Sequence, residues 1–135
     1  MAPDRNALVS IAASVSPTED PHRVMGAILQ ALGDVPHSVR SEGSRISVES
    51  SAPGNLDRLH DQLRDRRVRA TARRRLLAGR SGRRTTVMLN RQAASVGVLV
   101  LCDDEKESPL GPIFLTIRSD DLDGVIQWLT EFPSG

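Results

Sequence analysis

Arginine is the residue type in this chain whose number and spacing could do chemistry. Twelve arginines and only two acids, Asp61 and Asp65, fall between Arg58 and Arg91, so this stretch carries a formal charge of about +10. The remaining six basic residues face fifteen acids, about −9, and the two sums give the net charge of +1. Because a guanidinium group donates hydrogen bonds in a planar fork that fits a phosphate, the stretch predicts a surface for a polyanion.

The candidate contact residues lie in or directly after this basic stretch. We expect two helices, the loop that follows them and a polar turn to present them. They are Arg64, Arg66, Arg67, Arg69, Arg73, Arg74, Arg80, Arg83, Arg84, Asn90, Arg91 and Gln92. A helix turns by about 100° per residue, so the helical arginines form a collar rather than one stripe. The amides of Asn90 and Gln92 could read a base edge or a ribose hydroxyl, but we favour a structural role in a tight connection.

Two interpretations of the basic stretch stay open from the sequence. In the first, its guanidinium groups contact the phosphates of structured RNA, and binding weakens steeply as the salt concentration rises. In the second, they pair with the acidic remainder of the domain or with a second subunit, so that the chain is a protein-interaction or homodimerising subunit. A GC-rich coding bias also accounts for seventeen arginines against one lysine, Lys106.

The other reactive side chains form no pattern typical of catalysis or metal binding. His22, His37 and His60 lack the spacing of metal ligands, and Cys102 has no cysteine or histidine cluster around it. The acids between Asp103 and Glu107 lack the glycine of a calcium loop and predict a solvated turn. The sequence contains neither a Walker nor a dinucleotide-binding loop. We therefore expect no enzymatic activity, no cofactor and no metal.

Length and composition indicate the broad class of the protein. The 135 residues predict a single domain over 1–135, with residues 1–6 and 133–135 loosely ordered. No apolar run approaches about 18 residues and the N-terminus has no signal-peptide pattern, so we expect no membrane contact. A single cysteine fits a reducing compartment, and the chain is therefore predicted to be cytoplasmic.

Hydrophobic periodicity and turn residues predict the elements that must position the arginines. Strands are predicted at 8–15, 37–40, 45–50, 85–89, 96–101 and 113–117. Helices are predicted from Pro21, after an Asp20 cap, to Gly33, from an Asn55 cap through Leu63, over 68–78, and over about 122–130. We expect the apolar run 96–101 at the centre of the sheet, and the aromatic residues Phe114, Trp128 and Phe132 in the core.

The predicted order β-α-β-β-α-α-β-β-β-α indicates an α+β fold. Strands joined by short loops pair antiparallel with their neighbours, and each predicted helix has a single apolar stripe. The arrangement that buries all these stripes most simply is a two-layer sandwich. It consists of a mostly antiparallel sheet with helices on one face.

Two segments, Leu89–Gly97 and Ser108–Ile113, resemble the signature stretches of an uncharacterised archaeal protein family. Pro17–Pro21 and Ala72–Arg73 resemble the same family at the expected positions, so the resemblance covers about residues 9–129. That family is classed as RNA-binding-like, with a fold similar to the fifth large-subunit ribosomal protein. The resemblance therefore implies this fold and an RNA-binding role, without an established reaction.

The resemblance has two further implications. Genes of the family can lie beside that of a late coenzyme A biosynthesis kinase, which implies an enzyme or a regulator of coenzyme A metabolism as the least favoured alternative. The chain also departs from the family pattern at Val87 and Met88, where the resemblance implies aromatic residues in relatives, and at Ser95, where it implies that a phenylalanine is common. If those aromatics stack on bases in relatives, that contact is missing here.

Overall fold

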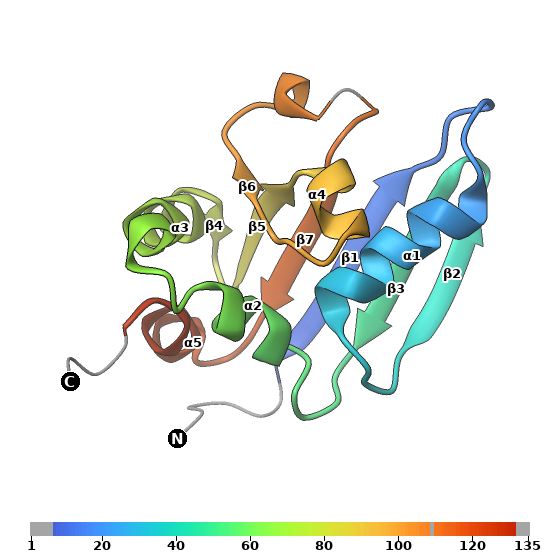
Figure 1. The fold of residues 1–135 in the computed structure, drawn as a ribbon. Helices are drawn as coiled ribbons and strands as arrows, with labels where there is room; N and C mark the ends of the chain where they lie inside the picture. The colour runs from blue at the N-terminus through green and yellow to red at the C-terminus, as the bar shows by residue number, and fades with distance from the viewer. Residues whose placement is uncertain (1–6, 109, 132–135) are drawn as a thin grey trace.

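The computed structural model describes residues 7–108 and 110–131, which form one antiparallel sheet with helices on one face (Figure 1). In chain order the elements are β1 (Leu8–Ser14), α1 (Pro21–Leu32), β2 (Ser38–Glu42), β3 (Arg45–Ser50), α2 (Asp57–Gln62), α3 (Arg66–Ala78), β4 (Arg80–Ser81), β5 (Arg84–Leu89), α4 (Arg91–Ser95), β6 (Leu101–Cys102), the 3-10 turn η1 (Glu105–Glu107), β7 (Ile113–Arg118) and α5 (Leu122–Thr130). The predicted α+β sandwich is confirmed, with β4 and α4 as additional short elements.

The sheet has the strand order β2-β3-β1-β7-β5-β4, and β6 pairs with the other end of β5. All pairs are antiparallel, and the register places Ile11 of β1 opposite both Val48 of β3 and Leu115 of β7. Because side chains alternate along a strand, such residues form continuous apolar rows on one face. The helices cover this face with buried residues that include Ile28, Leu59, Leu76 and Ile126.

No helix of the described residues covers the opposite face of the sheet, and this face has a different composition. Its central positions are half-buried polar residues, which include Ser10, Thr86 and Thr116. Phe114 also lies on this face, half-buried and paired with Met88, so its predicted core position is wrong. Phe132 lies outside the described residues. Trp128 packs against the core as expected and stacks on His60, with ring centroids 4.1 Å apart.

The prediction of a central strand over 96–101 is wrong. Val96 is 76% exposed, and only Leu101 and Cys102 pair with the sheet, beside β5. The backbone turns at Gly97, which has φ +83°. The Gln62 side-chain amide then donates a hydrogen bond to the Gly97 carbonyl and accepts one from Leu99 N–H. A side chain thus satisfies groups that a strand would have paired, while β1 and β7 occupy the centre of the sheet.

The helix cap predicted at Asp20 is present in the structure, whereas the one predicted at Asn55 is not. Asp20 caps α1 as predicted, because its side chain accepts a hydrogen bond from His22 N–H. Asn55 does not cap α2, which begins after Leu56 without a side-chain cap. Instead, Asn55 is buried, and its amide donates to the carbonyls of Ala7 (2.8 Å) and Ser50 (2.9 Å). It therefore joins the chain entering β1 to the end of β3.

Substitution of Asn55 by alanine is expected to lower the free energy of unfolding by about 1–3 kcal/mol, since two buried carbonyls lose their donor. Urea denaturation monitored by circular dichroism measures the change. Ser41→Ala, at an exposed position of β2, is the control and should change stability by less than about 0.5 kcal/mol. Equal stability of the two variants would contradict this role of Asn55.

Candidate anion-binding sites

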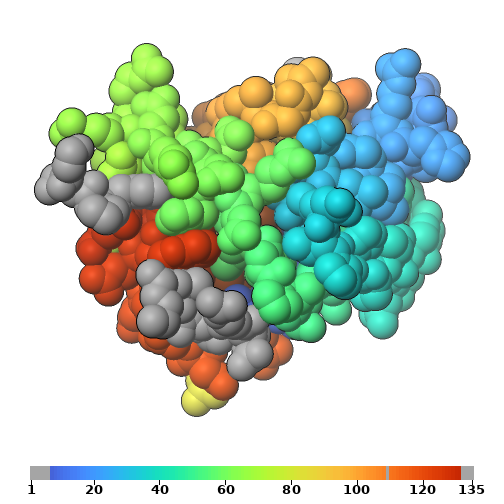
Figure 2. Space-filling view, turned by 60° about the horizontal axis from the view of Figure 1, so that its bottom comes forward, coloured from blue at the N-terminus to red at the C-terminus, as the bar shows by residue number. Residues whose placement is uncertain are grey.

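Seven of the twelve arginines of the basic stretch meet a carboxylate of the same chain, and one of them, Arg91, is described separately below. The other six pairs are Arg64–Asp61 (3.5 Å), Arg67–Asp65 (3.1 Å), Arg73–Glu131 (3.4 Å), Arg75–Asp103 (2.6 Å), Arg83–Asp120 (3.0 Å) and Arg80–Asp123. The surfaces of α3 and α5 lie side by side (Figure 2), which brings Arg73 to Glu131 just after α5. Four of the six pairs link the basic stretch to acids outside it, as the intramolecular interpretation expects.

Several of these ion pairs are exposed on both sides. The Arg64 and Asp61 side chains are 71% and 67% exposed, and those of Arg83 and Asp120 are 74% and 90% exposed. Exposed pairs typically stabilise a fold by about 0–1 kcal/mol, because water and salt screen both charges. A phosphate oxygen can therefore replace the carboxylate at little cost to the fold.

Three arginines of the stretch have no ion pair and no hydrogen-bonding side-chain contact within the described residues: Arg66 and Arg74 on α3, and Arg84 on β5. Both helical residues are exposed and lie away from the buried Ala72 and Leu76 of the same helix. Arg69 differs, since its guanidinium donates to the Arg64 carbonyl at 2.9 Å. The outer side of α3 thus keeps unpaired positive charge.

Arg84 has a basic neighbour that the sequence analysis did not identify. Arg118, at the end of β7, lies directly opposite Arg84 on the face of the sheet without helices, and both residues are exposed. Neither forms an ion pair within residues 7–108 and 110–131. Two like charges at opposite positions repel, and a bridging anion would relieve this repulsion. Only the pairing of β5 with β7, which no local pattern specifies, brings the two side chains together.

Asn90, Arg91 and Gln92 are not part of the arginine collar, because α4 packs against α1 (Figure 1). Asn90 caps α4 by accepting from Ala93 N–H at 2.9 Å, and its amide donates to the Glu107 carbonyl at 3.1 Å. This agrees with the structural role that we favoured for Asn90. Gln92 lines a cavity between α1 and α4, described below.

Arg91 forms a buried ion pair. It is 4% exposed, and its Nη1 donates to both carboxylate oxygens of Glu19, at 2.9 and 2.7 Å. Burial by itself would raise the pKa of Glu19, but the hydrogen bond from Ser16 N–H and the Arg91 guanidinium outweigh it and hold that pKa below its ordinary value. From the sequence, Glu19 was recognised only as part of a helix start. Its pairing with Arg91 could not be predicted, because the two residues are 72 positions apart and no local pattern connects them.

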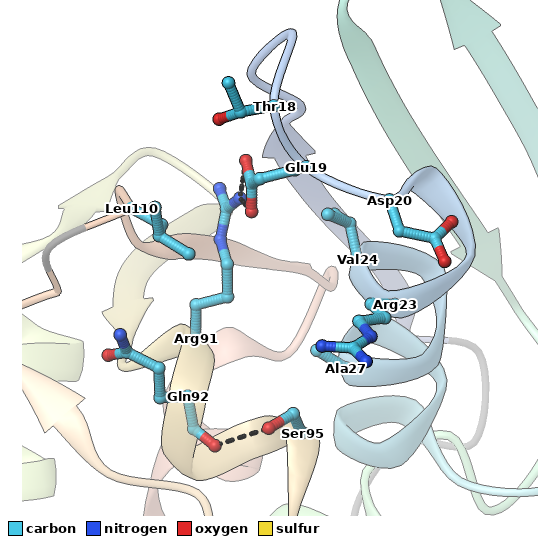
Figure 3. Close-up of a pocket in the computed structure, with 10 residues that line it drawn as sticks. All are labelled: Thr18, Glu19, Asp20, Arg23, Val24, Ala27, Arg91, Gln92, Ser95 and Leu110. Atoms are coloured by element: carbon cyan, nitrogen blue, oxygen red, sulfur yellow. Dashed lines mark hydrogen bonds and ion pairs between the residues drawn. The ribbon is translucent and has the colours of Figure 1, made fainter.

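A cavity of about 430 Å³ lies beside this ion pair, between α1 and α4 (Figure 3). Three of the four segments that resemble a known family meet around it. Thr18 and Glu19 come from Pro17–Pro21, Arg91 and Gln92 come from Leu89–Gly97, and Leu110 comes from Ser108–Ile113. Ser108 joins the last two, because its hydroxyl accepts from Arg91 N–H (3.2 Å) and donates to the Gly111 carbonyl (2.8 Å). This convergence makes the cavity a second candidate site.

Within 7–108 and 110–131, no three His, Cys, Asp or Glu side chains are grouped so that they could hold a metal ion. In the same part of the chain, no helix combines the length and the apolar character needed to cross a bilayer. Cys102 is buried, and burial together with Glu107 and Asp103 raises the pKa of its thiol.

Comparison with known proteins shows similarity along most of the chain. A UPF0201 protein of Sulfurisphaera tokodaii is 41% identical over 125 residues, which cover 90% of this chain and 86% of that protein. A UPF0201 protein of Metallosphaera sedula is 36% identical over 122 residues, with 90% and 85% covered. The crystal structure of an uncharacterized UPF0201 protein matches with a TM-score of 0.70 at 31% identity and covers 84% of each chain. No family model matches the sequence.

Proposed function

Since this chain belongs to the UPF0201 family of archaeal proteins, whose names state neither a ligand nor a reaction, we propose a function from its own charges. The protein binds structured RNA through backbone phosphates and has little base specificity. The observation that carries this proposal is a group of four exposed arginines on α3, β5 and β7, none of which has an intramolecular partner among the described residues: Arg66, Arg74, Arg84 and Arg118. The RNA-binding-like classification implied by the family resemblance agrees with it.

Two of these arginines form the first part of the RNA surface, on α3. Arg66 and Arg74 are eight residues apart, so about 12 Å separates them along the helix axis. Arg67 lies between them in sequence, and its pair with Asp65 leaves the arginine side chain 89% exposed. The outer side of α3 can therefore offer several guanidinium groups to successive phosphates.

Arg84 and Arg118 form the second part, at the end of β5 and β7. The neighbouring exposed pair Arg83–Asp120 can open when a phosphate competes for the guanidinium. Few aromatic rings are available for base stacking, because Phe114 is half-buried on this face and Trp128 packs against the core. Phosphate contacts without stacking position an RNA but do not read its sequence.

Fluorescence anisotropy with a structured RNA at about 50 and 200 mM salt tests the proposal. Each lost phosphate contact should reduce the salt slope of log K by about 0.7–0.9, so the double variants Arg66→Gln/Arg74→Gln and Arg84→Gln/Arg118→Gln should each reduce it by about 1.5. The affinity should fall to the same extent for RNAs of different sequence.

The matched control is Arg40→Gln/Arg45→Gln, which removes the same charge from β2 and β3, where Glu42 lies opposite Arg45. This control should change the salt slope by less than half as much. Absence of binding at the lower salt concentration would overturn the proposal. Salt-sensitive self-association without RNA, measured by static light scattering, would instead identify the charges as a subunit interface.

A further inference from the structure

The guanidinium of Arg91 has two buried donors without an acceptor. Its Nη1 donates hydrogen bonds to the Glu19 carboxylate, whereas its Nε and Nη2 have no hydrogen-bond partner in the described structure. A buried donor that loses its contact with water and gains no acceptor destabilises the folded state. Such groups are uncommon in native proteins and indicate a bound water, ion or ligand.

The adjoining cavity is large enough for more than a water molecule. Its volume of about 430 Å³ compares with roughly 30 Å³ for one water and falls within the range of small-molecule sites. Val24 and Ala27 of α1 and Leu110 supply apolar wall, and Thr18, Gln92 and Ser95 supply polar groups. A mixed lining of this kind holds the body of a small ligand and orients its polar end.

Two further side chains that line this space carry hydrogen-bond donors. The Arg23 guanidinium of α1 extends toward the cavity, and Gln92 of α4 lines it next to Arg91 (Figure 3). Neither side chain has a hydrogen bond or ion pair within residues 7–108 and 110–131. Asp20, the other acid of the lining, points away from the cavity and caps α1.

The charges of the site favour an anion. Glu19 already compensates Arg91, and no carboxylate of the described residues forms an ion pair with Arg23. We propose that the cavity between α1 and α4 binds a small ligand through an oxyanion group, a phosphate or a carboxylate. Its oxygens accept hydrogen bonds from Arg91 and Gln92 and pair with Arg23. This site is separate from the RNA surface proposed on α3, β5 and β7.

The binding test uses the full chain and follows the Arg91 Nε–H resonance by NMR. Inorganic phosphate and pyrophosphate represent one source of the oxyanion, and citrate represents the other. Sodium chloride at equal ionic strength is the control. We expect a saturable shift of this resonance with at least one oxyanion at millimolar concentration, and a rise in Tm with the same probe, because a ligand bound to the native state stabilises it. The probe that binds identifies the source.

Arg23→Gln is the diagnostic variant, because Arg23 is exposed and its replacement leaves the buried ion pair in place. Loss of one charge-assisted contact should weaken binding of the same probe by about tenfold. Arg40→Gln, which removes an exposed arginine of β2, should leave the affinity for this probe unchanged. No shift of the Arg91 resonance with any of the three probes would overturn the proposal, as would equal affinities of the wild type and Arg23→Gln. Arg23→Gln should still bind RNA, because Arg23 is not part of the proposed RNA surface. Failure of the cavity proposal and failure of the proposed function can therefore be told apart.

Discussion

Replacement of Arg91 by methionine is expected to lower the free energy of unfolding by about 3–5 kcal/mol, which reduces Tm by on the order of 10 °C or more. The variant leaves the Glu19 carboxylate, whose side chain is 9% exposed, without its cation. A charge that is buried and unpaired is far more costly than the intact ion pair is stabilising. Thermal and urea denaturation, both followed by circular dichroism, measure the loss.

A double variant separates loss of the ion pair from loss of packing. Glu19→Gln/Arg91→Met removes both charges and should recover much of the stability that Arg91→Met loses, because no unpaired charge stays buried. If the double variant is as unstable as the single one, the unpaired carboxylate is not the cause. Arg66→Met serves as a control at an exposed position and should change stability by less than about 0.5 kcal/mol.

The same ion pair predicts how stability depends on pH. The pKa of Glu19 is lower in the folded protein than its ordinary value, so the ionised carboxylate stabilises the fold. This contribution is complete above the pKa of the unfolded chain and is lost as the pH falls through the lowered folded pKa. The wild type should therefore lose stability more steeply than Glu19→Gln once the pH falls below the ordinary pKa of a glutamate carboxyl, as measured by urea denaturation across the acidic range. Identical profiles would contradict the role assigned to Glu19.

Replacement of Gly79 by alanine is expected to lower the free energy of unfolding by about 3 kcal/mol. A Cβ at this position, between α3 and β4, would lie well inside van der Waals contact with the Thr86 carbonyl oxygen of β5. Thr86 N–H donates to the Gly79 carbonyl at 3.2 Å, so the two backbones must approach closely. Because backbone cannot move aside like the end of a side chain, α3 must shift from the sheet and lose packing.

Gly26→Ala is the matched control for this substitution. Gly26 lies within α1, and no atom comes within 4 Å of a Cβ added there. Alanine in a helix interior is favoured over glycine by about 0.5–1 kcal/mol, so this variant should be more stable than the wild type. Urea denaturation of both variants measures the difference. A Gly79→Ala protein as stable as Gly26→Ala would show that the close approach of α3 and β5 is not required.

The sequence by itself determined the elements whose signals are local. Asp20 and Pro21 mark the start of α1, and the alternation around Ile46 and Val48 marks β3, because a cap and a period of two act over a few residues. The order of strands and helices followed from these signals. Together with short connections, it was sufficient to predict an α+β sandwich with helices on one face.

Local signals failed where a distant partner decides the structure. The apolar run 96–101 resembles a strand, yet the Gln62 side chain bonds its backbone and leaves Val96 exposed. Asn55 resembles a helix cap in the sequence. In the structure its amide instead donates hydrogen bonds to two carbonyls, which the pairing of β1 with β3 brings together. In both cases a contact across the fold satisfies groups that the local pattern assigned to another partner.

The functional surfaces depended on the tertiary structure most of all. The sequence established an excess of arginine between Arg58 and Arg91, but the acids that neutralise part of it lie far along the chain. Strand order alone brings Arg118 opposite Arg84, and the packing of α4 on α1 brings Glu19 to Arg91. Charge composition is a property of a stretch of chain, whereas an ion pair or a free guanidinium is a property of its surroundings. Only the packing of the elements creates those surroundings.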